Sequence, residues 1–286
     1  MRINTNVSSL TAQEAAQNTT KTLTGSLEKL STGLRINKAS DDASGLAIAD
    51  KLRTQSTSIK QGIDNGNSAV SLLQIADKSM AEQSNILDTI KSKLIQANTA
   101  TTSADGRNAI AGDITKLLEQ LDNIAEQTNY NGTALLQKHA SSGGANTGAM
   151  TGLKFQIGEK STDTIIMGNV QSNVTGLKLG SLNTKVKTGS ISAASAGVFQ
   201  KSIDTALTSL NKFRAEVGST QNQVESAVRN LMTQATNVKA AESIIRDVDY
   251  AQESANFNKQ NIISQAGSYA ISQANAVQQN VLRLLQ

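Results

Sequence analysis

The feature that most constrains this chain is a line of apolar residues that recurs every seven positions through its N-terminal half. The residues on this line are Leu52, Ile59, Leu73, Met80, Leu87 and Leu94, and Gly66 is the one interruption. A seven-residue apolar repeat keeps one stripe of a helix facing a partner helix, as in a coiled coil. Ile63 and Val70 add a neighbouring line. The spacing predicts one long helix over about 46–96, roughly 70 Å in length at 1.5 Å per residue.

The composition favours long helices over a thick globular core. The 286 residues include no Pro, no Cys and no Trp, with four Phe and three Tyr. Pro is the residue that stops helices most strongly, and aromatic side chains supply much of the buried area in globular cores. The net charge of +4 comes from 27 basic and 23 acidic residues, with no dense Lys/Arg run. We therefore expect no nucleic-acid partner, and no disulfide or thiolate chemistry.

Seams of the same kind run through four other segments, and the two at the ends of the chain are the weak ones. Near the N-terminus the apolar positions are Leu23, Leu27, Leu30 and Leu34. After a turn cluster at 99–106 they are Ile110, Ile114, Leu117, Leu121 and Ile124. In the C-terminal half they are Phe199, Ile203, Leu207, Leu210, Val217, Val224, Val228, Leu231 and Val238. The last segment has Ile263, Gly267, Ala270, Ala274, Val277, Val281 and Leu284. Such seams predict a mainly-α fold, a long antiparallel helical coiled-coil hairpin.

Two polar interruptions separate the terminal segments from the longer inner ones. The first, at 37–44, contains Ser40, Asp41 and Asp42, residue types that favour helix caps and turns. The second is the charged cluster 246–249. Because the terminal seams are weak, we expect the two ends to pair with each other. We also expect them to stay unfolded until other molecules cover them.

The middle of the chain changes character at about 138–198. Residues 138–151 have the Ser/Gly-rich composition of a loop. Leu153, Phe155 and Ile157 alternate with polar residues, which predicts a strand, and 164–167 and 174–179 are further strand candidates. This β-hairpin insert is too small to be a domain of its own. Asn131-Gly132 is a strong turn signal.

The residues that could carry chemistry do not converge on a site. The single His, His139, lies in the Ser/Gly loop, and the paired Asp residues at 41–42 and at 247 and 249 are typical of helix caps. We therefore predict no enzyme activity, no metal site and no cofactor. The Ser and Thr residues at 140–195 are either acceptors of O-linked glycans or simply loop solvation. The N-terminus lacks the apolar core of a signal peptide, and no apolar run approaches the roughly 18 residues of a membrane span.

Four motifs resemble the signatures of bacterial flagellins. They are Leu34-Arg-Ile-Asn-Lys-Ala-Ser-Asp-Asp-Ala-Ser-Gly-Leu-Ala-Ile-Ala49, Thr128-Asn-Tyr-Asn-Gly-Thr-Ala-Leu-Leu136, Ile245-Arg-Asp-Val-Asp-Tyr-Ala251 and Gln273-Ala-Asn-Ala-Val-Gln-Gln-Asn-Val-Leu-Arg-Leu-Leu-Gln286. The resemblance covers about 1–137 and 198–286. It implies a D0 coiled coil made of 1–40 and 247–286, a D1 helical rod over 41–246, and no outer D2 or D3 domain.

The resemblance also implies a function and a set of partners. The chain would polymerise with copies of itself into the extracellular filament of the flagellum, a helical propeller for motility. It would be exported without a cleaved signal peptide by the flagellar type III export apparatus, with a flagellin export chaperone, and would meet flagellar cap and hook-associated proteins. Two alternatives stay open: a hook–filament junction protein of the same family, and a coiled-coil adhesin or secreted protein that does not polymerise.

The resemblance assigns two sets of functional residues. The D0 seam would be Leu23, Leu27, Leu30, Ile263, Ala270, Val277, Val281 and Leu284. The spoke that joins D0 to D1 would contain Arg35, Asp41 and Asp42 on the outgoing chain and Arg246, Asp247 and Asp249 on the returning chain. We expect this spoke to be a contact between subunits as well as a hinge.

The chain departs from the family pattern at two places. Members often have Pro where this chain has Gln278, so the last helix is expected to run straighter. A Toll-like receptor senses flagellins at positions that carry Arg, Glu and Leu in strongly sensed members; here they are Thr89, Ser92 and Lys93, and Asp113 keeps the acidic character of another contact. The lost Arg donors and the added Lys predict weak sensing.

Overall fold

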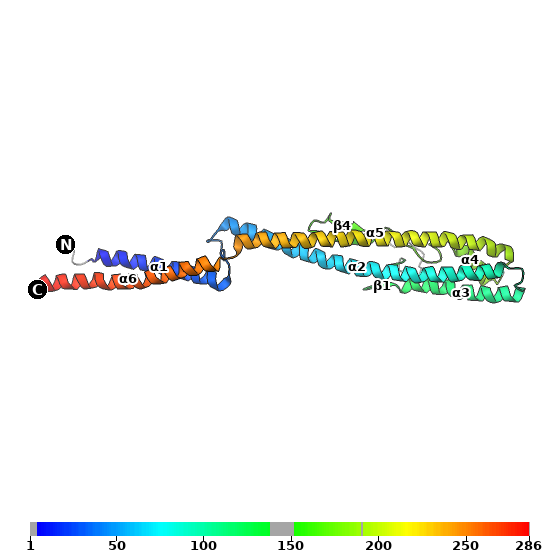
Figure 1. The fold of residues 1–286 in the computed structure, drawn as a ribbon, viewed down its shortest axis with the longest axis horizontal. Helices are drawn as coiled ribbons and strands as arrows, with labels where there is room; N and C mark the ends of the chain where they lie inside the picture. Colours follow the sequence, from blue (N-terminus) through cyan, green and yellow to red (C-terminus); the bar gives the residue numbers. More distant parts are fainter. Residues whose placement is uncertain (1–4, 138–151, 190, 286) are drawn as a thin grey trace. The chain divides into compact units, whose positions relative to one another are not determined.

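The structure is a computed structural model that describes residues 5–137, 152–189 and 191–285, with the backbone alone at Gln278 and 281–285. Its helices are α1 (Val7–Thr32), α2 (Ala43–Asn98), α3 (Ala104–Gln127), α4 (Gly180–Lys187), α5 (Ala193–Arg246) and α6 (Tyr250–Leu285). Its strands are β1 (Asn129–Tyr130), β2 (Thr133–Ala134), β3 (Lys154–Gln156) and β4 (Thr164–Ile166). The predicted mainly-α fold with a small β insert is confirmed. Figure 1 shows these elements along the chain.

The chain forms two compact units. One contains Met1–Ser56 and Thr236–Gln286, and the other contains Thr57–Ala235. Helices α2 and α5 each contribute to both units. The predicted boundaries between D0 and D1, at 40 and 247, lie close to the start of α2 and the end of α5 and differ from the limits of these two units. The division into D0 and D1 stays a prediction.

The core of the 57–235 unit follows the predicted seven-residue line of α2. The residues Ile59, Gly66, Leu73, Met80, Leu87 and Leu94 on this line are all buried. Leu52, which lies in the other unit, is half-buried. A coiled-coil seam requires burial at each successive position of the seven-residue repeat, so the predicted register is confirmed.

The second buried line of α2 differs from the prediction. It consists of Gly62, Ala69, Ala76, Gln83, Ile90 and Ala97, and all of these are buried. Ile63 and Val70, which were expected to form this line, are only half-buried. The small residues allow close approach: a Cβ added at Gly66 would collide with Val228 of α5, and one added at Gly62 with the backbone of Ile157. A search for large apolar residues misses a seam built from Gly and Ala.

Helices α5 and α3 complete this core. The buried heptad line of α5 consists of Ala196, Ile203, Leu210, Val217, Val224 and Leu231. Helix α5 runs antiparallel to α2, and two ion pairs join them: Arg214 Nε lies 3.0 Å from Asp77 Oδ1, and Lys91 Nζ lies 2.5 Å from Asp204 Oδ1. Ile110, Ile114 and Leu121 of α3 are buried as expected. The expected Leu117 and Ile124 are half-buried, and Leu118 and Ala125 take the core positions.

Gln83 is a polar residue in the middle of this apolar seam. Its side chain is fully buried, and its Nε2 donates to the carbonyl oxygens of Leu121 in α3 and Ser172 in the loop before α4, at 3.1 Å each. A buried amide that donates two hydrogen bonds avoids most of the desolvation cost of its donor group. Gln83 therefore ties α2 to two other segments.

The strands form two separate antiparallel hairpins, β1–β2 before the predicted insert and β3–β4 within it. In β1–β2, Tyr130 pairs with Thr133 across the turn Asn131-Gly132, whose φ angles are 49° and 80°. In β3–β4, Phe155 pairs with Ile165, so both predicted strands there are confirmed. The predicted third strand at 174–179 is wrong. The Asn173 side chain accepts from the Gly176 N–H at 2.7 Å, which forms a turn before α4 begins. Residues 138–151, including His139, lie outside the described residues.

Candidate functional site

The chain passes from α1 to α2 beside the point where it returns from α5 to α6. Helix α1 is capped after Thr32 by Gly33, whose φ of 73° is left-handed and whose N–H donates to Lys29 O. Arg35 N donates to Arg246 O at 2.7 Å, and Val248 N donates to Gly33 O at 3.0 Å. A side chain at Gly33 would also come within 2.9 Å of the Tyr250 hydroxyl. We call this crossing of 33–42 and 245–249 the joint; it lies within one compact unit.

Arg35 is the predicted residue that crosses the joint with its side chain. Its Nη2 and Nε donate to Ile245 O at 2.7 and 3.3 Å. Ile245 lies in the last turn of α5, where carbonyl groups lack helical partners and the helix dipole favours a cation. Next to Arg35, Ile36 is buried, and a Cβ at Gly45 would lie 2.7 Å from its Cδ1. This packing explains why Gly follows the polar segment.

The two aspartates of the outgoing chain organise their own segment. Asp41 Oδ2 accepts from the backbone N–H groups of Asn37 and Lys38, at 3.1 Å each. These two hydrogen bonds lower the pKa of Asp41 below its ordinary value of 3.8. Asp42 Oδ1 accepts from Gly45 N at 2.9 Å and so caps the start of α2. The predicted link to the returning chain therefore does not run through these carboxylates.

The returning chain has the same local character. Asp249 Oδ1 accepts from Ala251 N at 2.9 Å and Gln252 N at 3.2 Å, which caps α6, and Asp247 Oδ2 accepts from Ser243 Oγ at 2.5 Å. Arg246 contributes its backbone carbonyl to the joint. Sequence reasoning missed one contact at the joint, the ion pair of 2.7 Å between Lys38 Nζ and Glu28 Oε2 of α1, which raises the pKa of Lys38.

Helices α1 and α6 pack as an antiparallel pair (Figure 1). Their half-buried and buried positions recur at alternating intervals of three and four residues. The positions that follow this spacing are Ser9, Ala12, Ala16, Thr19, Leu23, Ser26 and Leu30 on α1 and Glu253, Phe257, Gln260, Ser264, Gly267, Ile271 and Ala274 on α6; Gly25, Glu28, Lys29 and Ala276 are also half-buried. A Cβ at Gly267 would lie 3.8 Å from Ala16 Cβ, and Asn6 Nδ2 donates to Ala274 O at 3.1 Å. Ser26 Oγ donates to the Glu253 carboxylate.

The predicted seam agrees with this pair only in part. Leu23 and Leu30 lie in it, but Leu27 is exposed, and so are Ile263, Ala270 and Val277. These four lie outside the seam, because α6 carries apolar residues on more than one line and spacing alone does not select the buried one. The side chains of Gln278, Val281 and Leu284 lie outside the described residues.

The pair therefore leaves an uncovered set of apolar side chains, which we call the apolar flank. Its members are Val7, Leu10 and Leu27 on α1 and Ile262, Ile263, Tyr269 and Val277 on α6, with exposed fractions from 41% for Ile263 to 75% for Tyr269. No charged residue interrupts α6 between Lys259 and Arg283. Large apolar side chains that stay exposed on a helix stretch without charged residues are typical of an interaction surface.

The positions predicted to correspond to the sensed face of flagellins lie on α2 and α3. Thr89 and Ser92 are exposed. Lys93 Nζ lies 2.6 Å from Asp113 Oδ2, so these two predicted positions form an ion pair with each other. Thr89 Oγ1 donates to Asn85 O within the helix. The four residues thus present short polar groups and one neutralised charge pair.

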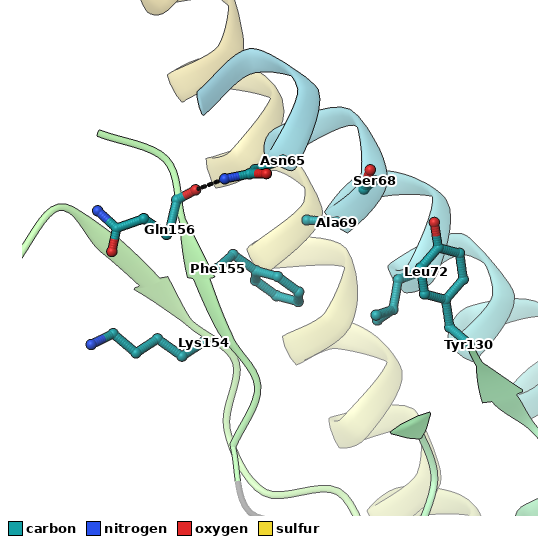
Figure 2. A pocket seen from close by; sticks show the side chains of 8 residues that line it. All are labelled: Asn65, Ser68, Ala69, Leu72, Tyr130, Lys154, Phe155 and Gln156. Atoms are coloured by element: carbon teal, nitrogen blue, oxygen red, sulfur yellow. Dashed lines mark hydrogen bonds between the residues drawn. The ribbon is translucent and has the colours of Figure 1, made fainter. Parts of the chain in front are cut away.

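A groove of about 300 Å³ lies between α2, β1 and β3. In Figure 2, Tyr130 and Leu72 face each other at one end, and Asn65 donates to Gln156 O at 3.0 Å at the other. Lys154 and Tyr130 are the titratable side chains among the residues that line it. Elsewhere in 5–137, 152–189 and 191–285, no three His, Cys, Asp or Glu side chains gather as a metal site would require, and no helix is apolar enough over a sufficient length to cross a bilayer.

Comparison with known proteins agrees with this arrangement. The bacterial flagellin N-terminal helical region matches residues 3–141, and the bacterial flagellin C-terminal helical region matches residues 200–285. A flagellin from Bacillus subtilis is 35% identical over 303 aligned residues, and flagellin FlaB2 from Treponema pallidum is 33% identical over 289, each covering 100% of both chains. A putative flagellar hook-associated protein from Vibrio parahaemolyticus shares the fold, with a TM-score of 0.59 over 72% of this chain and 99% of that one, at 11% identity.

These matches define a helical structural protein of the bacterial flagellum. The chain belongs to the bacterial flagellin family. Its members self-assemble into the extracellular flagellar filament, and this chain is a structural subunit of such a filament. The alternative of a hook-associated protein is not better supported, because that likeness is one of fold alone.

We predict that Asp41 makes the stability of the joint depend on pH. Its carboxylate accepts two backbone hydrogen bonds only when folded, so its folded pKa is depressed. The stabilisation is present above the unfolded pKa and is lost as pH falls through the folded pKa. Carbon-detected NMR titration of the Asp41 carboxyl should give a midpoint below 3.8.

The matched control is Asp41→Asn, which keeps the shape but removes the titration. The difference in unfolding free energy between wild type and this variant should shrink as pH falls from about 6 towards 2. A difference that stays constant over this range would show that the carboxylate charge does not stabilise the joint.

Proposed function

We propose that neighbouring copies of the chain cover the apolar flank of the α1–α6 pair in the filament. The observation that carries this proposal is the exposure of Ile262, Tyr269 and Val277 on a helix with no charge between Lys259 and Arg283. Each large apolar side chain that is fully buried contributes about 1.5–3 kcal/mol. A flank of seven such residues therefore provides a large driving force for polymerisation.

The family organisation suggests how the two ends work. We propose that 1–40 and 247–286 act as the D0 coiled coil, and that 41–246 act as the D1 rod without outer domains. In this scheme the weak seam between α1 and α6, with Ser, Thr, Ala and Gly at most positions, lets the ends separate before assembly. Export without a cleaved signal peptide by the type III apparatus, with a chaperone for the C-terminal segment, is compatible with ends of this kind, as are contacts with cap and hook-associated proteins. No catalytic step is part of this function.

We propose that the joint acts as the spoke between these two parts and touches a neighbouring subunit. Asp41 and Asp42 are exposed, although each holds its own segment through backbone hydrogen bonds. A carboxylate that fixes a turn while facing solvent is available to a neighbour. Arg35, whose side chain bonds Ile245 O, supports the angle at which the two segments cross.

We also propose that the flagellin-sensing Toll-like receptor responds weakly to this chain. Thr89 and Ser92 offer short side chains at positions where long charged ones anchor the receptor in sensed members. Lys93 is held by Asp113 at 2.6 Å, so the receptor would have to break this pair or bury it. Burial of a charge without a new partner is costly.

For assembly, we predict that Ile262→Asp prevents polymerisation while the monomer keeps its helical content. Ile262 is 68% exposed, so the change costs little in the isolated chain, but a covered carboxylate would be desolvated without a partner. The critical concentration in a sedimentation assay should rise at least about tenfold, a change of roughly 1.4 kcal/mol per subunit.

The matched control for assembly is Ile166→Asp in β4, since Ile166 is 64% exposed and lies in the other unit. It should polymerise with a near wild-type critical concentration. Normal polymerisation of the Ile262→Asp variant would show that the apolar flank is not part of the interface between subunits.

For the joint, we predict that Asp41→Ala combined with Asp42→Ala alters filament waveform and swimming. Loss of each carboxylate should cost about 1 kcal/mol at the turn or at the start of α2 without unfolding the 57–235 unit. Asp41→Asn combined with Asp42→Asn keeps acceptor oxygens and should fall between wild type and the Ala variant. Unchanged waveform and swimming in the Ala variant would show that the joint only links the two parts of the chain and does not contact a neighbouring subunit.

For receptor sensing, we predict that purified monomer activates a reporter cell line weakly. The triple variant Thr89→Arg, Ser92→Glu and Lys93→Leu restores the residue types of sensed flagellins. It should activate at concentrations at least about tenfold lower, because an Arg anchor at an interface is often worth 2 kcal/mol or more. Strong activation by the wild-type monomer would contradict the proposal.

A further inference from the structure

The sequence contains two Asn-Gly pairs, Asn65-Gly66 and Asn131-Gly132. Asn followed by Gly is the pair most prone to deamidation, because Gly has no side chain to obstruct the backbone nitrogen that attacks the Asn side chain. The two pairs have the same local chemistry. Any difference between them must therefore come from the fold.

Asn65-Gly66 is held in the middle of α2. The Asn65 amide donates to Gln156 O at 3.0 Å, and Gly66 is buried against Val228 of α5. A reactive geometry at Asn65 requires the helix to open within the seam on which the unit is built. Such openings have free energies near that of global unfolding.

Asn131-Gly132 lies at the tip of the β1–β2 hairpin. Both residues are exposed, and a Cβ at Gly132 would meet nothing within 4 Å. The hairpin has only two residue pairs, Asn129 with Ala134 and Tyr130 with Thr133. Both turn residues have positive φ, the pattern of a type I′ turn. A two-pair hairpin opens at low cost, so Asn131 reaches reactive conformations far more often than Asn65.

We propose that Asn131 is a site of spontaneous covalent modification in the folded protein, with water as the co-reactant. The Gly132 backbone nitrogen attacks Asn131 Cγ, the Cγ–Nδ2 bond breaks, and ammonia leaves with the proton of the Gly132 N–H. The five-membered succinimide then takes up water at one of its two carbonyls and opens. The products are aspartate or isoaspartate at position 131, each with one added negative charge.

The two products affect the hairpin differently. Aspartate tolerates the left-handed conformation that Asn131 adopts at φ 49°, so the turn persists. Isoaspartate lengthens the main chain by one carbon inside a two-residue turn, which the pairing of Tyr130 with Thr133 cannot accommodate. Leu135 and Leu136, both fully buried, follow directly after β2. The isoaspartate form should therefore loosen the attachment of this core segment.

The test is incubation of the full-length folded protein at mildly alkaline pH, followed by peptide mass mapping. Conversion at Asn131 should proceed at least about tenfold faster than at Asn65. Chains unfolded in urea should convert at both sites at similar rates, which shows that the fold sets the difference. Hydrogen exchange should be faster at 133–136 in the isoaspartate fraction than in the aspartate fraction.

Two variants provide controls. Asn131→Gly removes the reactive amide and accepts positive φ, so it should show no conversion at this turn. Asn131→Asp reproduces the charge without the longer backbone and should keep wild-type exchange at 133–136. Equal rates at Asn131 and Asn65 in the folded protein, or no conversion at Asn131 while the unfolded chain reacts, would overturn the proposal.

Discussion

The structure depends on the close packing of α2 against α5 along one heptad seam. Large side chains on one line of α2 alternate with Gly and Ala on the other, and α5 presents its own line of Ile, Leu and Val. The small residues let the backbones approach, so the burial of each Leu or Met is nearly complete. The ion pairs between α2 and α5 are secondary, because they lie at the partly exposed rim of this seam.

The register of the long helices could be predicted from the sequence, but the faces of the terminal helices could not. In α2 a single line of Leu, Ile and Met stands out against polar neighbours, so spacing identifies the buried face. In α6 several lines carry apolar or small residues, and the line chosen from spacing, through Ile263, Ala270 and Val277, is exposed. In the proposed filament, α6 would contact helices of neighbouring subunits as well as α1. A single chain contains only α1, so its sequence alone does not identify which face of α6 is buried.

At the joint, too, part of the structure could be predicted from the sequence and part could not. Its location followed from residues that favour caps and turns, and Asp42 and Asp249 do cap the helices that follow them. The crossing itself depends on backbone hydrogen bonds between 33–35 and 246–248, which leave no trace in side-chain identity. Arg35 was recognisable only as a charge, since its acceptor, Ile245 O, is a carbonyl that any residue would present.

Gln83 has a consequence for how the helices find their alignment. Heptad seams repeat, so α2 could slide past its neighbours by seven residues and still match apolar to apolar. After such a slip the Gln83 amide would lose its two acceptors, the carbonyl oxygens of Leu121 and Ser172. A buried polar group left without partners costs about 1–3 kcal/mol. The Gln83 amide therefore makes an alignment of the helices shifted by one heptad less stable than the native alignment.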